Sequence, residues 1–210
     1  MTRRFGMAAL LAMLGCAVLV GCGGGGGGSV SVPDTPDGTI KAVADNIAAG
    51  KPHVLWSAMP ASYQKDIDGL VKEFAAGMDP EVYDKGAALL KKLSDVLKKQ
   101  RKLVASSSMT AQSKMKPEDA DAAIGSLVVV LEAVTGSGLG SHAGLKSLDV
   151  GKFLAGPGAE VMGKFSELSA LTPDDGYNKE FLPKVKGVKV EVVKTEGDKA
   201  TVKVTSGDGK

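Results

Sequence analysis

Cysteine is almost absent from this sequence. The chain contains two, Cys16 and Cys22, and both lie near the N-terminus. From residue 23 onward there is no thiol, which excludes an internal disulfide and a cysteine nucleophile in that part of the chain. A fold built from it has to be stabilised by packing alone.

Histidine is equally scarce, with only His53 and His142 in separate segments. No histidine pair has a metal-binding spacing, and no G-x-S-x-G sequence indicates a serine nucleophile. Carboxylates such as Asp119 and Asp121 are two residues apart, so they do not share a helix face and are interpreted as surface residues. We therefore expect no catalytic residue, no metal site and no enzymatic activity.

Two glycine patterns resemble nucleotide-binding loops but lack their context. Residues 138–143 match G-x-G-x-x-A, in which glycines let the backbone approach a pyrophosphate at a helix N-terminus. That fingerprint follows a strand, whereas the segment before residue 138 is predicted to be helix. Gly158 and Gly163-Lys164 have phosphate-loop spacing, but Phe165 replaces the hydroxyl that would hold magnesium. We expect no cofactor.

Aromatic residues are also few, at 4 % of the chain with a single Trp. The apolar content comes mainly from Ala, Val and Leu, a composition that favours helices.

An apolar run lies close to the N-terminus. Arg3 and Arg4 precede the uncharged stretch from Met7 to Val20, which is the layout of an export signal peptide. About 14 residues are too few for a membrane-spanning helix, which needs about 20, so we expect residues 1–21 to be cleaved. Loss of Arg3 and Arg4 would make the 26 basic residues equal in number to the 24 acidic ones, with Arg101 as the single arginine. Nucleic acid is therefore not an expected partner.

The apolar run ends in Leu19-Val20-Gly21-Cys22, which resembles the lipobox of bacterial lipoproteins. The resemblance implies diacylglycerol transfer to the Cys22 thiol, cleavage before Cys22 and acylation of its new amino group. It implies a protein anchored by lipid in the cell envelope, on the periplasmic face or the cell surface, and at the outer membrane in a Gram-negative cell. Cleavage before Cys16 would leave an apolar region of only about six residues, below the usual 7 to 15 or so.

Residues 22–37 are predicted to be a tether. From Gly23 onward this segment consists of Gly, Ser, Val, Pro, Asp and Thr without an apolar period. A flexible coil of this length has a typical reach of roughly 20 Å. The prolines at 33 and 36 stiffen its distal end.

Residues 38–185 are predicted to form a helical domain, because apolar residues recur there at helical spacing between recognisable start and stop signals. Asp37 or Thr39 is expected to cap the first helix, Gly50 to end it in a left-handed conformation, and Asp79-Pro80 to begin the longest one. Residues 105–116 and 136–144 are expected to be loops. The expected helices are 39–49, 52–59, 61–76, 80–104, 117–135, 147–155, 158–171 and 173–184.

The period changes from 3.6 to 2 in residues 186–210. Val188, Val190 and Val192 alternate with polar residues, and the alternation resumes at Ala200 after a turn-forming stretch at 195–198. This pattern predicts a β-hairpin with one apolar face, and hence an α+β fold that is mainly helical with a C-terminal antiparallel hairpin. A lone hairpin is marginally stable, so either it covers the helices by itself or the chain is shorter than its relatives.

The helix expected at 80–104 has two contrasting faces. An apolar stripe, expected to face the core, contains Val82, Leu89, Leu90, Leu93, Val96 and Leu97. The opposite arc is basic and contains Lys85, Lys91, Lys92, Lys98, Lys99, Arg101 and Lys102. Such an arc either contacts an anionic lipid or polysaccharide surface, where each cation contributes about 1 kcal/mol, or is the solvated side of a bundle helix. The sequence pattern alone favours the solvated side.

The two ends of the predicted domain carry a further resemblance. Ile40 to Ile47, Gly50-Lys51, Leu55-Trp56, Met59-Pro60 and Tyr63 resemble the opening of small exported lipoproteins with the nuclear-transport-factor-two-like cone fold, and residues 197–202 are similar to their late strands. The long helical middle has no counterpart in that fold, so neither a cavity nor a functional residue is carried over.

These patterns together predict a lipid-anchored envelope protein that is a non-catalytic binding or structural module. Its expected partners are the membrane, through the anchor, and an envelope protein or polysaccharide. One alternative is a carrier of an apolar ligand, which requires a closed apolar cavity. Another is an envelope hydrolase, which requires a large pocket with convergent polar groups.

Overall fold

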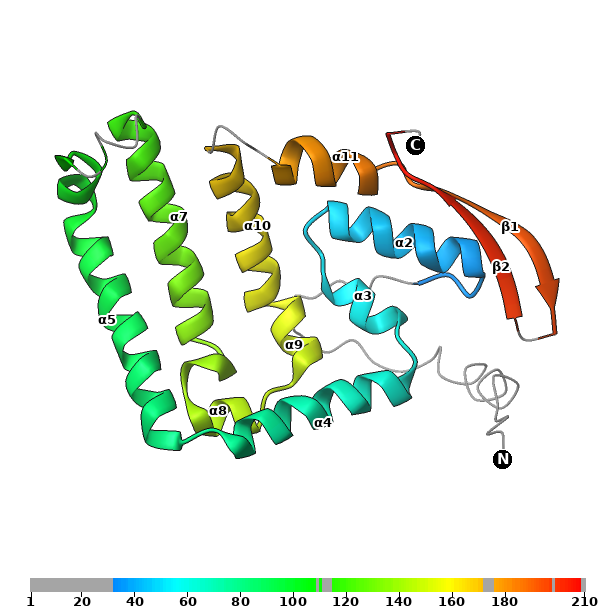
Figure 1. Ribbon diagram of the computed structural model, residues 1–210, viewed down its shortest axis with the longest axis horizontal. Coiled ribbons are helices and arrows are strands. Elements are labelled where there is room, and N and C mark those ends of the chain that lie inside the picture. Colours follow the sequence, from blue (N-terminus) through cyan, green and yellow to red (C-terminus); the bar gives the residue numbers. More distant parts are fainter. Residues whose placement is uncertain (1–31, 109, 111–114, 172–175, 198, 209–210) are drawn as a thin grey trace, which may run out of the picture.

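The computed structural model describes residues 32–108, 110, 115–171, 176–197 and 199–208. The predicted signal peptide and most of the predicted tether, including Cys22, lie outside these residues. The described chain confirms the predicted fold class, since it is mainly helical and ends in an antiparallel two-stranded hairpin (Figure 1). In chain order the elements are α2 (Pro36–Ala48), α3 (His53–Ala58), α4 (Ala61–Gly77), α5 (Pro80–Ala105), α7 (Pro117–Thr135), the 3-10 turn η2 (Gly138–Gly140), α8 (His142–Lys146), α9 (Val150–Ala155), α10 (Pro157–Ala170), the π-helical turn η3 (Tyr177–Phe181), α11 (Leu182–Val185), β1 (Lys189–Glu196) and β2 (Lys199–Thr205).

The helix boundaries follow local signals in the sequence. The Asp79 carboxylate accepts a hydrogen bond from the Val82 amide at 2.9 Å and caps α5 as predicted. The first helix begins slightly earlier than predicted, because the Thr35 hydroxyl caps it by accepting a hydrogen bond from the Gly38 amide. Gly50 follows that helix with φ of 73°, so the predicted left-handed stop is confirmed.

Helices α5, α7 and α10 lie side by side in one layer (Figure 1). Helix α4 runs along one end of this layer and contacts α8, while α2, α3 and α11 lie beyond α10, at the side of the molecule opposite α5. The buried apolar side chains are mostly small: Val54, Ala75, Ala105, Ala120, Val128, Leu145 and Val188. Small side chains let neighbouring helices approach closely. Many of the larger apolar residues are exposed.

The orientation of α5 differs from the prediction. Ser94 and Ala105 are buried on α5, and Arg101 also lies on the side that packs against α7. The residues predicted to face the core include Val82 and Leu89, which are 68 % and 65 % exposed, and Leu93 and Val96, which are about half exposed. Residues on the inward side are rotated from these by about one residue along the helix, or about 100°. The sequence pattern did not distinguish these two adjacent sides of the helix.

The segment predicted to be a glycine-rich loop at 136–144 contains η2 and most of α8. The Ser141 hydroxyl caps α8 by accepting a hydrogen bond from the Gly144 amide at 3.1 Å. A Cβ on Gly140 would lie 1.9 Å from the Thr135 carbonyl oxygen, so this glycine is needed for the turn to pack against the end of α7. The G-x-G-x-x-A pattern therefore has a structural explanation in this turn.

The predicted hairpin is confirmed. Strands β1 and β2 pair antiparallel, with Val190 opposite Val204 and Val192 opposite Val202, and the register shifts between Val192 and Lys194. Gly197 in the turn has φ of 60°, the left-handed conformation that glycine adopts readily. The hairpin packs against α2, where Val188 is buried just before β1.

Candidate functional site

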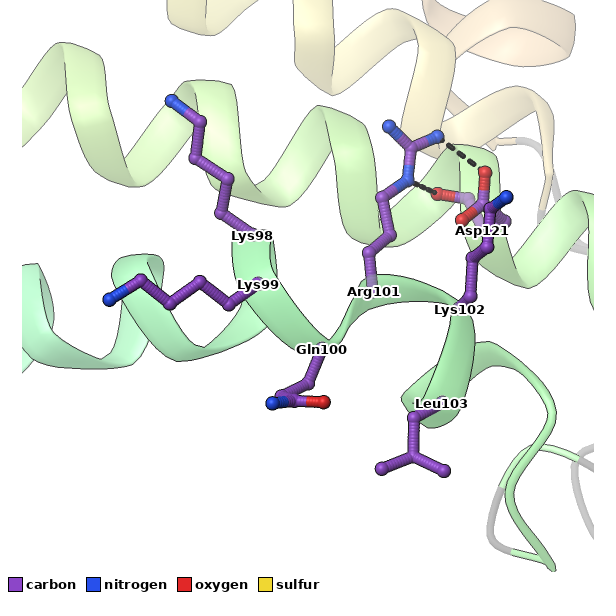
Figure 2. A pocket seen from close by; sticks show the side chains of 7 residues that line it. All are labelled: Lys98, Lys99, Gln100, Arg101, Lys102, Leu103 and Asp121. Carbon is purple, nitrogen blue, oxygen red and sulfur yellow. Dashed lines mark hydrogen bonds and ion pairs between the residues drawn. The ribbon is translucent and has the colours of Figure 1, made fainter.

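The longest helix is interrupted by a kink. Gln100 has φ of −107° and ψ of 16°, which lie outside the helical region, although α5 continues to Ala105. The kink opens a surface cleft of about 500 Å³ between the last turns of α5 and the first turns of α7. The cleft is lined by Lys98, Lys99, Gln100, Arg101, Lys102, Leu103 and Asp121 (Figure 2).

Arg101 is held in place by α7. Its Nη2 forms an ion pair with Asp121 Oδ2 at 2.7 Å, and its Nε donates a hydrogen bond to the Asp121 backbone carbonyl at 2.8 Å. A Cβ at Gly125 would lie 2.7 Å from the guanidinium carbon, so the missing side chain there gives the guanidinium room against α7. Much of the charge of Arg101 is therefore neutralised by Asp121.

Lys98 is also paired with α7. Its Nζ donates a hydrogen bond to Glu132 Oε1 at 2.8 Å, and this hydrogen bond raises the pKa of Lys98. Both side chains are largely exposed. Lys98 and Arg101 thus join α5 to α7, and they do not lie on the arc facing away from the core, where the sequence analysis placed them.

Lys99 and Lys102 differ from these two cations. Both are exposed, and within the described part of the chain neither forms an ion pair. The Lys99 side chain extends back alongside the preceding turns of α5, whereas Lys98 and Arg101 extend toward α7 (Figure 2). The cleft therefore combines two fixed, paired cations with two unpaired ones that can rearrange around an anion.

The remaining predicted contact residues are not part of the cleft. Lys91 and Lys92 precede it by about two helical turns, and both are exposed without an ion pair among the described residues. The predicted lipidation site Cys22 and the lipobox residues Leu19, Val20 and Gly21 lie outside the residues that the structure describes.

Three features of the cleft could not be identified from the sequence. Asp121 and Glu132 come from α7, and their pairing with α5 depends on how the helices pack. The sequence pattern around Asp121 indicates only an ordinary surface residue. The kink occurs at Gln100 without the proline or glycine that usually accounts for one, so no sequence signal indicated the cleft.

His142, one of the two histidines in the sequence, is a packing residue. It is buried, and its Nε2 is 2.7 Å from the Ala75 carbonyl oxygen at the end of α4. Its backbone amide donates a hydrogen bond to Asp84 Oδ1 at 2.7 Å, and the nearby Tyr83 hydroxyl donates one to the Leu139 carbonyl at 2.7 Å. Burial raises the pKa of Tyr83. These contacts connect α4, α5, η2 and α8.

Neither a membrane-spanning helix nor a cluster of metal ligands is found among the described residues. None of their helices has the length and apolar composition required to cross a bilayer. They contain no group of three or more His, Cys, Asp or Glu side chains arranged to hold a metal ion.

Comparison of the chain with protein-family models, with curated proteins and with solved structures finds no match. The lipobox and the resemblance to nuclear-transport-factor-two-like lipoproteins therefore stay predictions, and the functional argument depends on the residues themselves.

Proposed function

We propose that this chain is a lipid-anchored protein of the bacterial cell envelope that acts as a non-catalytic binding module. We further propose that the α5 cleft binds an acidic polysaccharide. The observation that supports this proposal is the presence of two unpaired lysines, Lys99 and Lys102, at a kink that opens a cleft in the helix. The lipobox sequence supports the location.

Electrostatics favours an anionic ligand over a neutral one. Asp121 and Glu132 each neutralise one cation, while Lys99 and Lys102 have no carboxylate partner among the described residues. An anion near the two lysines is therefore attracted without first displacing a protein carboxylate. Attraction between exposed charges decreases within about 8 Å at physiological ionic strength, so the ligand has to enter the cleft to benefit.

The shape of the site favours a polymer over a membrane. A bilayer surface is broad and flat, whereas the lysines lie around a recess about 500 Å³ in volume. A recess of this kind can accommodate part of one narrow chain, such as a polysaccharide with regularly spaced carboxylates. Acidic polysaccharide is therefore the ligand class that we propose, and an anionic bilayer is the alternative that the experiment tests.

The experiment measures binding of polygalacturonate to the full chain carrying Cys22→Ser, so that no lipid anchor contributes. We expect binding at low salt that weakens as salt is added. The double variant Lys99→Glu/Lys102→Glu should weaken it by roughly thirtyfold or more, because each cation contributes about 1 kcal/mol and reversal removes more than that. Neutral dextran should not bind.

The matched control is Lys65→Glu/Lys72→Glu, which makes the same charge change at two exposed positions on α4. It should bind polygalacturonate nearly as well as the parent. Equal weakening in both double variants would show a general charge effect and contradict the cleft. Binding to phosphatidylglycerol vesicles, without binding to the polysaccharide, would contradict the proposed ligand class.

A further inference from the structure

Helices α4 and α5 each carry an uncovered row of apolar side chains. On α4 the row contains Tyr63, Leu70 and Phe74, which are 62 %, 63 % and 61 % exposed. On α5 it contains Val82, Leu89, Leu93 and Val96. The spacing of three, four or seven residues places each row on one side of its helix. Two adjoining helices thus present apolar surface that no described part of the chain covers.

Both rows face the same broad side of the molecule. Each row residue directly precedes a residue on the inward side of its helix, as Phe74 precedes the buried Ala75 and Leu93 precedes the buried Ser94. Each row is therefore rotated from the inward side by about 100° in the same sense. From α4 into α5 the chain follows the edge of the layer, and the rest of the molecule lies on the same side of the chain along both helices (Figure 1). A rotation in the same sense therefore turns both rows toward the same broad face.

On each helix, the residues beside the row and away from the rest of the molecule form an outer flank. The outer flanks of the two rows have opposite charge. On α4, Asp66 and Glu73 each lie three residues after a row residue. On α5, Lys85, Lys92 and Lys99 occupy the equivalent positions after Val82, Leu89 and Val96. Lys85 is paired with Glu81 on its own helix, and the other four flank residues form no ion pair among the described residues. The surface therefore has an acidic arm and a basic arm.

We propose that a second copy of this chain covers these rows. A two-fold axis that bisects the corner between α4 and α5 exchanges the two arms, so that α4 of each copy lies antiparallel on α5 of the other. The same operation brings the acidic flank of α4 to the basic flank of α5, twice. Such an interface is self-complementary and closed, as a two-fold dimer requires.

The register of this contact follows from distances along the helices. Residues equally far from the corner meet, so Glu73 of one copy is opposite Lys85 of the other, and Asp66 is opposite Lys92. In the same register Leu70 lies level with Ala88, next to Leu89 of the α5 row. The Lys99 and Lys102 side of the kink lies beyond the end of the overlying helix, so the cleft is not covered.

The charges of the two flanks also favour a second copy of the chain over a bilayer as the partner. An anionic membrane would suit the lysine flank of α5, because basic amphipathic helices bind such surfaces. The acidic flank of α4 would oppose the same contact. A second copy satisfies both flanks.

The test is the molar mass of the full chain carrying Cys22→Ser, measured by light scattering after size-exclusion chromatography. The parent should have the mass of two chains. Asp66→Lys/Glu73→Lys should have the mass of one, and so should Lys85→Glu/Lys92→Glu. An equimolar mixture of these two variants should return to the mass of two chains, and so should a chain with all four substitutions. Recovery on mixing requires that both variants fold.

The control Lys65→Glu/Lys72→Glu changes two lysines on α4 that lie outside the row and should remain dimeric. A monomeric parent would overturn the proposal. Failure of the mixture and of the four-substitution chain to dimerise would overturn the acid-to-lysine pairing. The dimer proposal would also be overturned if the parent were monomeric and sedimented with phosphatidylglycerol vesicles, and if Leu89→Glu abolished that sedimentation. This outcome would identify a membrane-binding face.

Discussion

At the scale of single residues, cations that look alike in the sequence have different surroundings. Lys98 and Arg101 are paired with carboxylates on α7, whereas Lys99 and Lys102, each next to one of them in the chain, have no such partner among the described residues. Successive residues on a helix point about 100° apart, so neighbours in the sequence meet different environments. Composition and spacing predicted a basic helix, but only the packing of α7 separates the paired cations from the unpaired ones.

A residue-scale prediction concerns the cap of α9. Asp149 Oδ1 accepts a hydrogen bond from the Lys152 amide at 2.9 Å, and the hydrogen bonds from Lys152 lower the pKa of Asp149 below its ordinary value of 3.8. We expect Asp149→Ala to cost about 1 kcal/mol of stability at neutral pH, as the loss of a helix cap does. Urea unfolding measures this difference.

The pH dependence of that cost has a definite sign. Because the pKa of Asp149 is lower in the folded state, its contribution is fully present above the unfolded pKa and is lost as pH falls through the folded pKa. The gap between the parent and Asp149→Ala should therefore close on acidification below about pH 3.8. Asp149→Asn, which caps without titrating, should match the parent at neutral pH and lose less in acid. A gap that is constant with pH would contradict this account.

At the scale of helices and strands, sequence signals predicted positions better than orientations. The Asp79 cap, the left-handed Gly50 and the hairpin turn at Gly197 were all predictable, because each depends on a few adjacent residues. The inward face of α5 was not, since Ser94 is buried while Leu93 beside it is exposed. Helical periodicity finds the most apolar side of a helix, and the side that packs against α7 is less apolar.

The candidate site was predictable only in part, for the same reason. The sequence identified the basic residues of the last α5 turns, four of which line the cleft. The kink at Gln100 and the partners Asp121 and Glu132 depend on contacts between helices that are distant in the sequence. These contacts separate the cleft from a uniformly basic helix face.

An element-scale prediction concerns the contact between α5 and α7. Ser94 is 2 % exposed, and its hydroxyl has no hydrogen-bond partner in the described structure. A buried polar group without a partner costs about 1 to 3 kcal/mol. Alanine removes the hydroxyl and has the higher helix propensity. We therefore expect Ser94→Ala to stabilise the protein by about 1 kcal/mol in urea unfolding.

The matched variant Ser94→Leu should do the opposite, because there is no room for a large side chain where the two helices touch. Overpacking of this kind typically costs about 1 to 3 kcal/mol. If Ser94→Ala were destabilising by a similar amount, the hydroxyl would have a partner that this packing does not include.

At the scale of the whole molecule, one prediction concerns the anchor. Lipid at Cys22 would supply three acyl chains, each buried CH₂ contributing about 0.8 kcal/mol to membrane binding. We expect Cys22→Ser to shift the full chain out of the membrane fraction or to leave its signal peptide uncleaved, as shown by fractionation and intact mass. Cys16→Ser, which changes the other cysteine, should stay processed and membrane-bound. A processed Cys22→Ser protein that remained on membranes would contradict the lipid anchor.

The arrangement of the helices also determines how far the cleft stands from such an anchor. The described chain begins next to α2, while α5 forms the opposite side of the layer (Figure 1). With the attachment point on one side and the cleft on the other, the breadth of the folded domain adds to the reach of the linker. If the chain is anchored through Cys22, a domain standing upright on the membrane would hold the cleft well above the lipid head groups, within reach of polymers in the surrounding aqueous compartment and away from the bilayer.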